Sequence, residues 1–267
     1  MITDAQATEI ARRIRDAERS RVPTRQVSQL HPELGIDDAY AIQQAGVRLA
    51  EADGRVVRAR KIGLTSQVMQ DAVGISEPDH GVIYDDMFFR HGDAIPFDRF
   101  IAPRIEVELA FVLGADVRGP GCTLHEVLDA TEYVTPAVEI LDARFQMTDP
   151  DTASARTIVD TIADNAADAG IVVGERRFGP RELDLPWVCA VLRRNGVIEE
   201  SGVAAAVLDH PANGIVWLAD RLAAHDVGLR SGELLLAGSF TRPLWVHRGD
   251  EFVADYGPLG TIEFRFD

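Results

Sequence analysis

The stretch Arg104-Ile-Glu-Val-Glu-Leu-Ala-Phe-Val-Leu113 alternates large apolar side chains with two carboxylates. Successive side chains of a β-strand point to opposite faces of its sheet, so the alternation predicts a strand. One face of this strand carries five large apolar side chains: Ile105, Val107, Leu109, Phe111 and Leu113. The other face carries Glu106 and Glu108, and the apolar Ala110 and Val112 continue it. We therefore expect both carboxylates to be half buried, where a pair of like charges needs a partner.

The residues alone leave three partners open for this acidic pair: Arg104, a bound metal ion or a shared proton. A solvated strand face is the alternative that needs no partner at all. A third acid, Glu139, lies between apolar neighbours on another predicted strand, 136–141. Carboxylate oxygens are the ligands that Mg²⁺ and Mn²⁺ prefer over zinc's usual nitrogen and sulfur set. A third acid favours a cation, because one arginine does not neutralise three carboxylates.

Composition limits the class of protein. The chain has 267 residues, is 46% hydrophobic and carries a formal net charge of −16. Its length and apolar fraction predict a globular fold with a sizeable core. The negative charge argues against binding to nucleic-acid phosphates or to anionic membranes. Two cysteines, no signal-peptide pattern and no apolar stretch long enough to span a bilayer lead us to expect a cytoplasmic protein.

Periodicity predicts a strand-rich mixed α/β fold with a small helical N-terminal lobe. We expect helices at 3–18 and 37–54, a strand at 57–63, a short helix opening after Ser66, and loops with short strands over 75–103. Later elements are a helix from Thr123, strands at 136–141 and 170–173, a hairpin at Asn195-Gly196, a helix from Asp209, and strands at 234–237, 252–256 and 261–266. A boundary near residue 75 would divide the lobe, 1–75, from a β-rich catalytic domain, 76–267.

Two further residues are candidates for proton transfer. Lys61 follows Ala59 on the apolar face of its predicted strand and precedes Gly63, where a ligand can approach the backbone. Lysines in such places often run their stems along apolar surface and release the ammonium to water, so donation to an anionic oxygen is one of two interpretations. Asp79 lies between Pro78 and His80, where we expect a tight loop and where a turn-forming role competes with catalysis.

Several short motifs together resemble one family. They are Lys61-Ile-Gly-Leu-Thr-Ser66, Ser76-Glu-Pro-Asp79, Asp85-Asp-Met-Phe88, Pro103-Arg-Ile-Glu106-Val-Glu108, Pro136-Ala-Val-Glu139, Asp160-Thr161 with Asp164-Asn165-Ala166, and Gly238-Ser-Phe-Thr-Arg-Pro243. The resemblance is to the hydratase/decarboxylase family of meta-cleavage pathways in aromatic degradation, and it covers nearly the whole chain. That family is similar in fold to the catalytic domain of fumarylacetoacetate hydrolases. The resemblance therefore implies this fold here.

The resemblance also implies a lyase that depends on Mg²⁺ or Mn²⁺. The positions that match the family's metal ligands are Glu106, Glu108 and Glu139, and those that match its catalytic residues are Lys61 and Asp79. Positions that match residues near the substrate are Leu64, Thr161, Asn165, Ser239 and Arg242. A small-molecule 2-oxo or 2-hydroxy dienoic acid would be the substrate, and the family leads us to expect a higher homo-oligomer built on pentamers.

The implied reaction is the addition of water to a 2-hydroxydienoate diacid, with 2-oxo-hept-4-ene-1,7-dioate as the substrate of first choice. A second carboxylate would need a cation at the far end of the site, and Arg242 and Arg156 are the candidates. Decarboxylation of 4-oxalocrotonate and hydration of the monoacid 2-hydroxypenta-2,4-dienoate are the near alternatives. More distant ones are a fumarylpyruvate-type C–C hydrolase, for which His31 with Glu33 is the only local hint, and a non-catalytic scaffold subunit.

Overall fold

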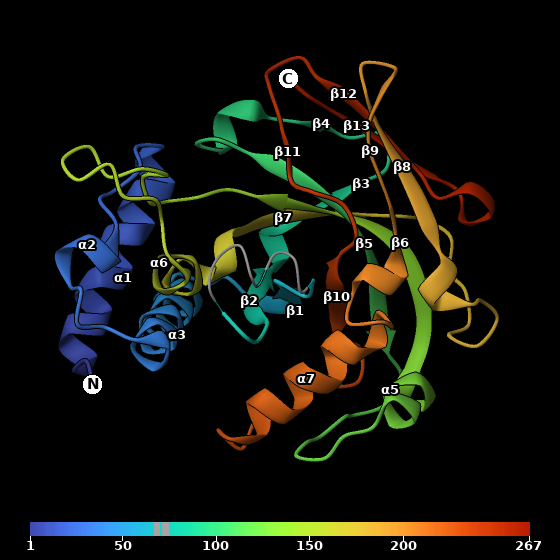
Figure 1. Ribbon diagram of the computed structural model, residues 1–267, viewed down its shortest axis with the longest axis horizontal. Helices are drawn as coiled ribbons and strands as arrows, with labels where there is room; N and C mark the ends of the chain where they lie inside the picture. The colour runs from blue at the N-terminus through green and yellow to red at the C-terminus, as the bar shows by residue number, and fades with distance from the viewer. Residues whose placement is uncertain (67–69, 71–74) are drawn as a thin grey trace.

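Two β-sheets and a group of N-terminal helices make up the computed structural model, which describes residues 1–66, 70 and 75–267 (Figure 1). The short helix expected after Ser66 lies outside the described residues. Within the described ranges, no helix combines the length and apolar character needed to cross a membrane. The mixed α/β fold expected from the sequence is confirmed.

The large sheet has eight strands within the described part of the chain, in the order β2-β1-β10-β5-β6-β7-β3, with β11 also paired to β5. Their bounds are β1 Val57–Gly63, β2 Asp79–Tyr84, β3 Phe88–Arg90, β5 Arg104–Leu113, β6 Thr131–Leu141, β7 Asp168–Val173, β10 Leu234–Ser239 and β11 Leu244–Trp245. β5 lies at the centre and pairs with β6 along nearly its whole length. The strand predicted from the alternating sequence is therefore confirmed, with the same bounds.

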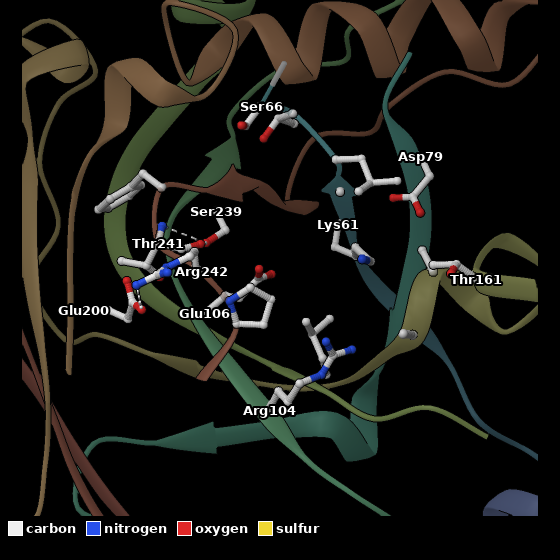
Figure 2. Close-up of a pocket in the computed structure, with 18 of the residues that line it drawn as sticks. Lys61, Ser66, Asp79, Arg104, Glu106, Thr161, Glu200, Ser239, Thr241 and Arg242 are labelled. Atoms are coloured by element: carbon white, nitrogen blue, oxygen red, sulfur yellow. Dashed lines mark hydrogen bonds and ion pairs between the residues drawn. The ribbon is translucent and has the colours of Figure 1, made fainter. Parts of the chain in front are cut away.

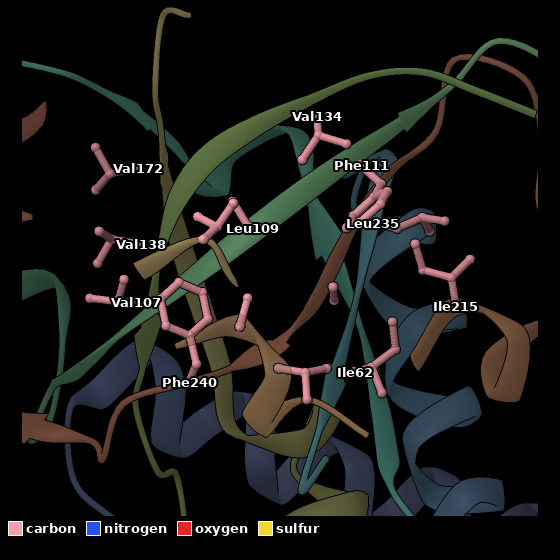
Figure 3. Close-up of a cluster of buried hydrophobic side chains, with 14 of the residues drawn as sticks. Ile62, Val107, Leu109, Phe111, Val134, Val138, Val172, Ile215, Leu235 and Phe240 are labelled. Carbon is pink, nitrogen blue, oxygen red and sulfur yellow. The ribbon is translucent and has the colours of Figure 1, made fainter. Parts of the chain in front are cut away.

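The two faces of β5 meet different surroundings, as the alternation predicts. Its five large apolar side chains belong to the main core, where Figure 3 shows Val107, Leu109 and Phe111 among side chains of neighbouring strands. That core continues to aromatic residues of the small sheet and to Ile215 of helix α7 (Ala212–Ala223). On the opposite face, Ala110 packs in a second cluster that reaches helix α3 (Ile36–Ala52). β5 is thus covered on both faces, which buries Glu108 with the apolar residues and leaves Glu106 half buried.

The small sheet has the order β4-β13-β12-β8-β9 and packs against the main core. Its strands are β4 Ala94–Ile95, β8 Cys189–Arg194, β9 Val197–Val203, β12 Glu251–Asp255 and β13 Thr261–Phe266. β8 and β9 form the hairpin expected at Asn195-Gly196, and both turn residues have positive φ. Asn-Gly favours this turn because both residues tolerate the left-handed conformation.

Six α-helices complete the described fold: α1 Asp4–Ser20, α2 Val27–Leu30, α3 Ile36–Ala52, α5 Leu124–Ala130, α6 Ile158–Ala163 and α7 Ala212–Ala223. The Thr3–Gln6 capping box begins α1, and Thr123 with Glu126 begins α5 in the same way. Helices α1, α2, α3 and α6 gather on one side of the molecule (Figure 1). Their shared apolar cluster holds α6 beside the large sheet, where it forms a wall of the candidate site.

Two local predictions are wrong. Asp79 is the first residue of β2 and not part of a loop. β6 begins at Thr131, so Pro136 lies inside a strand that was expected to start there. The Pro136 carbonyl accepts a hydrogen bond from Gly174, just beyond the end of β7. Because the N and O atoms of one strand residue point to the same side, the proline nitrogen faces the β7 side and the ladder to β5 continues.

The expected boundary near residue 75 stays a prediction. It falls between β1 and β2, which pair with each other in antiparallel fashion from Val57 to Gly63. β1 also pairs in parallel with β10, near the C-terminus of the chain. The helices before β1 form their own apolar cluster with α6. Because β1 belongs to the large sheet, a division of function near residue 75 would separate only the N-terminal helices from that sheet.

Leu109→Ala tests the role of the apolar face of β5. Leu109 is fully buried in the main core, so removing its side chain should lower the free energy of unfolding by about 2–5 kcal/mol. Urea denaturation followed by circular dichroism measures this change. Val197→Ala is the control, because Val197 lies on β9 and is 64% exposed, and its effect should stay within about 0.5 kcal/mol. Equal effects of the two changes would contradict the assignment of the core.

Candidate metal centre and active site

Three carboxylates converge on one face of the large sheet. Glu106 on β5 lies directly opposite Glu139 on β6, and Glu108 lies two residues further along β5 on the same face. Oxygen atoms of the three side chains all lie within 4.8 Å of one another. Glu108 and Glu139 are buried, whereas Glu106 is half buried at the floor of a cavity. The strand register therefore brings together the three acids that the sequence singled out.

The backbone around Glu108 is shaped to hold its carboxylate. Strand β10 shifts register against β5 just before Ser239, and the Gly238 N–H donates to Glu108 Oε2 at 2.9 Å. Gly238 has φ +118, and a Cβ there would clash with the Thr65 side chain, so the position requires glycine. The hydroxyl of Tyr256 lies within hydrogen-bond distance of the Glu108 and Ala137 carbonyl oxygens and so ties β5 to β6. The Gly238 backbone and the strands tied by Tyr256 therefore fix the orientation of the Glu108 carboxylate.

Burial makes the acidic cluster costly without a cation. Burial, then Glu139 and then the neighbouring Glu106 raise the pKa of Glu108 well above its ordinary value. Burial and Glu139 also raise the pKa of Glu106, to about 8. Glu108 Oε1 and Glu139 Oε1 are buried and accept no hydrogen bond from the described residues. Oxygen atoms of this kind are suited to a hard divalent cation, which would satisfy them and remove the repulsion.

Lys61 and Asp79 lie beside the carboxylate cluster. The Lys61 Nζ atom is 3.4 Å from Glu139 Oε1, and both side chains are buried. Burial by itself lowers the pKa of Lys61, but Glu139, Asp79 and the other nearby acids together raise it above its ordinary value. Asp79 pairs with Gly63 across β1 and β2, and a Cβ on Gly63 would clash with the Asp79 carboxylate. Because Gly63 has no side chain, the Lys61 ammonium and the Asp79 carboxylate both fit beside it.

Asp168 is a buried acid that the sequence analysis missed. It is the first residue of β7 and pairs with Leu141, two residues beyond Glu139 on β6. Its side chain is fully buried, neither carboxylate oxygen has a hydrogen-bond donor among the described residues, and burial and the adjacent Glu139 raise its pKa well above the ordinary value. The strand was expected to start at residue 170, so nothing in the sequence placed Asp168 beside Glu139. The centre therefore holds one more acidic side chain than expected.

A cavity of about 800 Å³ opens above this centre (Figure 2). This volume lies within the range of small-molecule sites in proteins. Lys61, Asp79, Arg104 and Glu106 come from the large sheet and point into it. One wall is formed by residues 155–158 with Thr161 of α6, and the facing wall by residues 198–201 and 239–243. The cavity therefore combines proton-transfer groups, a carboxylate cluster and room for a small substrate.

The cavity includes four of the five expected substrate contacts. Leu64, Thr161, Ser239 and Arg242 line it. The Ser239 hydroxyl donates to the Thr241 carbonyl oxygen at 2.8 Å, and Arg242 pairs with Glu200 at 2.8 Å. The fifth residue is not brought to the cavity: the side-chain amide of Asn165 accepts from the Val82 N–H and donates to the Val82 carbonyl. Asn165 therefore holds β2 in place.

Two histidine positions lie outside this cavity. His31 Nδ1 is 3.7 Å from Glu33 Oε1, but this pair is partly exposed and lines a separate small hollow with the N-terminus. His80 is buried and stacks on the Tyr40 ring, with centroids 4.7 Å apart. Burial lowers the pKa of His80 to about 3, which keeps its imidazole neutral. In the described part of the chain, no His/Glu pair for a hydrolase-type reaction lies at the carboxylate centre.

The family model described as fumarylacetoacetate (FAA) hydrolase C-terminal matches residues 62–267. The chain belongs to the fumarylacetoacetate hydrolase family. The family resemblance and the fold expected from the sequence motifs are therefore confirmed. The matched region begins inside β1 and includes every residue of the carboxylate cluster together with Asp79, whereas Lys61 lies one residue before it.

Relatives within the fumarylacetoacetate hydrolase family cover the whole chain. A 2-oxo-hept-4-ene-1,7-dioate hydratase of Escherichia coli is 55% identical over 97% of both chains. A 2-keto-4-pentenoate hydratase of Paraburkholderia xenovorans is 38% identical over 100% of this chain and 97% of that protein. The solved structure of 4-oxalocrotonate decarboxylase from Pseudomonas putida G7, complexed with magnesium and adipate, has a TM-score of 0.95 and 31% identity, covering 100% and 99% of the two chains. Each of these three proteins is similar to this chain over at least 97% of its length.

The raised pKa values of the glutamates predict pH-dependent metal binding. A cation must displace the protons that Glu106 and Glu108 retain, so the rise in Tm on adding Mn²⁺ should grow with pH and level off above about 8. The metal-free protein should behave in the opposite way. Acids whose folded-state pKa is raised stabilise the fold while protonated, so its stability should fall as pH rises from their ordinary pKa toward about 8.

Differential scanning calorimetry with and without Mn²⁺ across this pH range makes the measurement. Glu108→Gln is the matched variant, because it keeps the size of the side chain and removes one anionic ligand. Its Tm should rise less with Mn²⁺ at every pH. A metal-induced shift that is independent of pH, or equal in the variant and the unmodified protein, would contradict the assignment of this centre.

Proposed function

We propose that this chain is a divalent-metal-dependent hydratase that converts 2-oxo-hept-4-ene-1,7-dioate to 4-hydroxy-2-oxoheptanedioate, with Mg²⁺ or Mn²⁺ as its cofactor. The observation that carries the proposal is the cluster of three carboxylates, whose member Glu106 lines one cavity together with Lys61 and Asp79. The similarity to the Escherichia coli hydratase over nearly the full length supports this choice of substrate. The magnesium in the related decarboxylase structure supports the cofactor.

Glu106, Glu108 and Glu139 would hold the cation. When bound there, it supplies the positive charge that binds the substrate's carboxylate and adjacent 2-oxo oxygen and that stabilises negative charge developing on this oxygen. The protein holds these ligands in position: the Gly238 N–H orients Glu108, and the β5–β6 register places Glu106 opposite Glu139. Such preorganisation matters because the carboxylates need no rearrangement when charge develops.

Lys61 is proposed to donate to the oxygen on C2 of the substrate. Its raised pKa keeps the ammonium form, so the group acts as a proton donor and a positive charge. The ion pair with Glu139 places Nζ beside the carboxylate cluster, where the 2-oxo oxygen would lie. Stabilising the enol form in this way allows a proton to leave C3 and gives a dienol conjugated through C5.

Asp79 is proposed to transfer protons to C5 and from the water that adds at C4. Protonation at C5 converts the dienol to an enone with a C3=C4 double bond, and this makes C4 electrophilic. Water then forms a bond to C4 while a proton returns to C3, so the net change is the addition of one water molecule. Burial raises the pKa of Asp79, although Lys61 opposes the shift, and neither of its oxygens accepts a hydrogen bond from the described residues. A carboxyl in this state can exchange a proton with carbon or with water.

Decarboxylation of 4-oxalocrotonate is the second candidate, because the related decarboxylase has almost the same fold over its whole length. Hydration of the monoacid 2-hydroxypenta-2,4-dienoate is the third, supported by the Paraburkholderia relative. All three reactions start from a 2-oxo or 2-hydroxy acid and use the same binding of its first two oxygens. The cytoplasmic location and the pentamer-based homo-oligomer stay predictions.

Product analysis distinguishes these reactions. The purified protein with Mg²⁺ should consume the seven-carbon dienoate and form 4-hydroxy-2-oxoheptanedioate without releasing CO₂, as followed by ultraviolet absorbance and mass spectrometry. Lys61→Ala should lower kcat by about 100-fold or more, because it removes the proton donor. Arg58→Ala is the control, since Arg58 is exposed on the same strand.

The Lys61→Ala variant should still gain Tm with Mn²⁺, because all three carboxylates remain. Release of CO₂ in place of hydration would replace the proposed reaction with decarboxylation. Normal turnover by Lys61→Ala would contradict the role of Lys61. Loss of both turnover and the metal-induced shift would show that Lys61 supports the centre structurally.

A further inference from the structure

A buried arginine with unused hydrogen-bond donors lies in the wall of the candidate active site. The side chain of Arg156 is 10% exposed and lines the cavity. Its Nε and Nη1 atoms are buried and have no hydrogen-bond partner in the part of the chain that the structure describes. A buried cation without partners is costly, because a guanidinium stays charged in proteins and loses its hydration on burial. Arg156 therefore has the capacity to bind an anion.

The nearest carboxylate does not satisfy Arg156, because another arginine already occupies it. Asp164 Oδ2 is 4.0 Å from Arg156 Nη1, which is beyond hydrogen-bond distance. Arg144 donates from Nε to Asp164 Oδ1 at 2.6 Å and from its backbone N–H to Oδ2 at 2.8 Å. The remaining nitrogens of Arg144 bind backbone carbonyls. The Asp164 carboxylate is thus hydrogen-bonded to Arg144. Its negative charge lowers the free-energy cost of burying Arg156, but it forms no hydrogen bond with Arg156.

A second arginine faces the same space. Arg104, at the start of β5, points into the cavity and has no ion-pair partner within the described ranges (Figure 2). Its guanidinium stacks on the Trp245 ring, 5.1 Å from the centroid, and so is held in place. Burial lowers the pKa of Arg156 and Asp164 opposes this, while the positive charge of Arg104 lowers it further. Two cations that repel each other in one cavity wall favour an anion between them.

The location of Arg156 suits the far end of a substrate. Arg156 belongs to the wall formed by residues 155–158 and lines the same cavity as Asp79. Asp79 is proposed to act at C4 and C5, the carbons that lie towards the second carboxylate of the seven-carbon diacid. The facing wall offers Arg242, but its side chain is 79% exposed and already pairs with Glu200. Of the two far-end candidates, Arg156 is the one with unused donors.

We propose that Arg156, with Arg104 beside it, forms the subsite that binds the second carboxylate of a diacid substrate and sets the preference for diacids over monoacids. A guanidinium suits this task because its planar donors match the two oxygens of a carboxylate. The inference rests on the proposed function for the identity of the substrate. The subsite itself can be tested without turnover.

Binding of saturated analogues provides that test. 2-Oxoheptanedioate has both carboxylates, 2-oxoheptanoate has the same chain length and lacks the second one, and neither contains the double bond that is hydrated. With the Mn²⁺-loaded protein, isothermal titration calorimetry should show tighter binding of the diacid. Arg156→Gln should weaken diacid binding by about 10- to 100-fold, as expected for lost charge-assisted hydrogen bonds, and leave monoacid binding nearly unchanged. Arg156→Lys should restore part of the difference.

Two further variants make the test specific. Arg181→Gln is the matched control, because Arg181 pairs with Asp129 away from the cavity and should leave both affinities unchanged. Arg242→Gln tests the opposite wall. Equal loss of diacid and monoacid binding in Arg156→Gln would overturn the inference, and so would a diacid-specific loss in Arg242→Gln alone.

Kinetics then separate this inference from the proposed function. In Arg156→Gln, kcat/KM should fall for the seven-carbon dienoate and stay nearly unchanged for 2-hydroxypenta-2,4-dienoate. If the unmodified protein hydrates neither dienoate but binds the saturated diacid through Arg156, the proposed reaction is wrong and the subsite stands. If it hydrates the diacid and Arg156→Gln retains full diacid preference, the subsite is wrong and the reaction stands.

Discussion

The repulsion among buried carboxylates is the constraint on which the site depends. Glu106, Glu108, Glu139 and Asp168 lie close together at the level of the central strands, and among the described residues only Lys61 forms an ion pair with one of them, Glu139. Buried like charges are unfavourable unless they bind protons or a cation. Apolar packing on the other face of β5 supplies the stability that lets the fold tolerate this arrangement. A cation at the centre would turn a destabilising cluster into a binding site.

The alternation of β5 explains why one strand can serve both purposes. Its odd-numbered residues from Ile105 to Leu113 form the core, so the strand cannot shift by one residue without exposing them. That restriction fixes Glu106 and Glu108 on the opposite face and sets them against β6 and β10. The hydrophobic core therefore positions the carboxylates from the opposite face of the strand. Stability and function are coupled through register.

The sequence predicted what local patterns determine and missed what distant contacts determine. Alternation was enough for β5, and Asn195-Gly196 was enough for the β8–β9 hairpin. Asp79 was placed in a loop because Pro78 and Gly81 are typical of turns. In the structure Gly81 lies in β2, where the backbone of Asn165 leaves no room for a Cβ. Asp168 was missed because only the pairing of β7 with β6 brings it to Glu139. No local pattern could reveal that Arg144 forms the hydrogen bonds to the Asp164 carboxylate and that Arg156 keeps unused donors.

The order of charges around the cavity gives the proposed substrate a direction. The acidic centre attracts a diacid only through a cation, so the end with the 2-oxo group belongs there, where the carboxylate and the oxo oxygen are adjacent. The other carboxylate would be repelled by the same acids and needs separate positive charge, which Arg156 and Arg104 provide from the cavity walls. In that orientation C3 to C5 would lie near Lys61 and Asp79, which line the same cavity. A monoacid would satisfy the centre but leave two neighbouring guanidiniums unpaired, which is a physical reason for a preference between otherwise similar substrates.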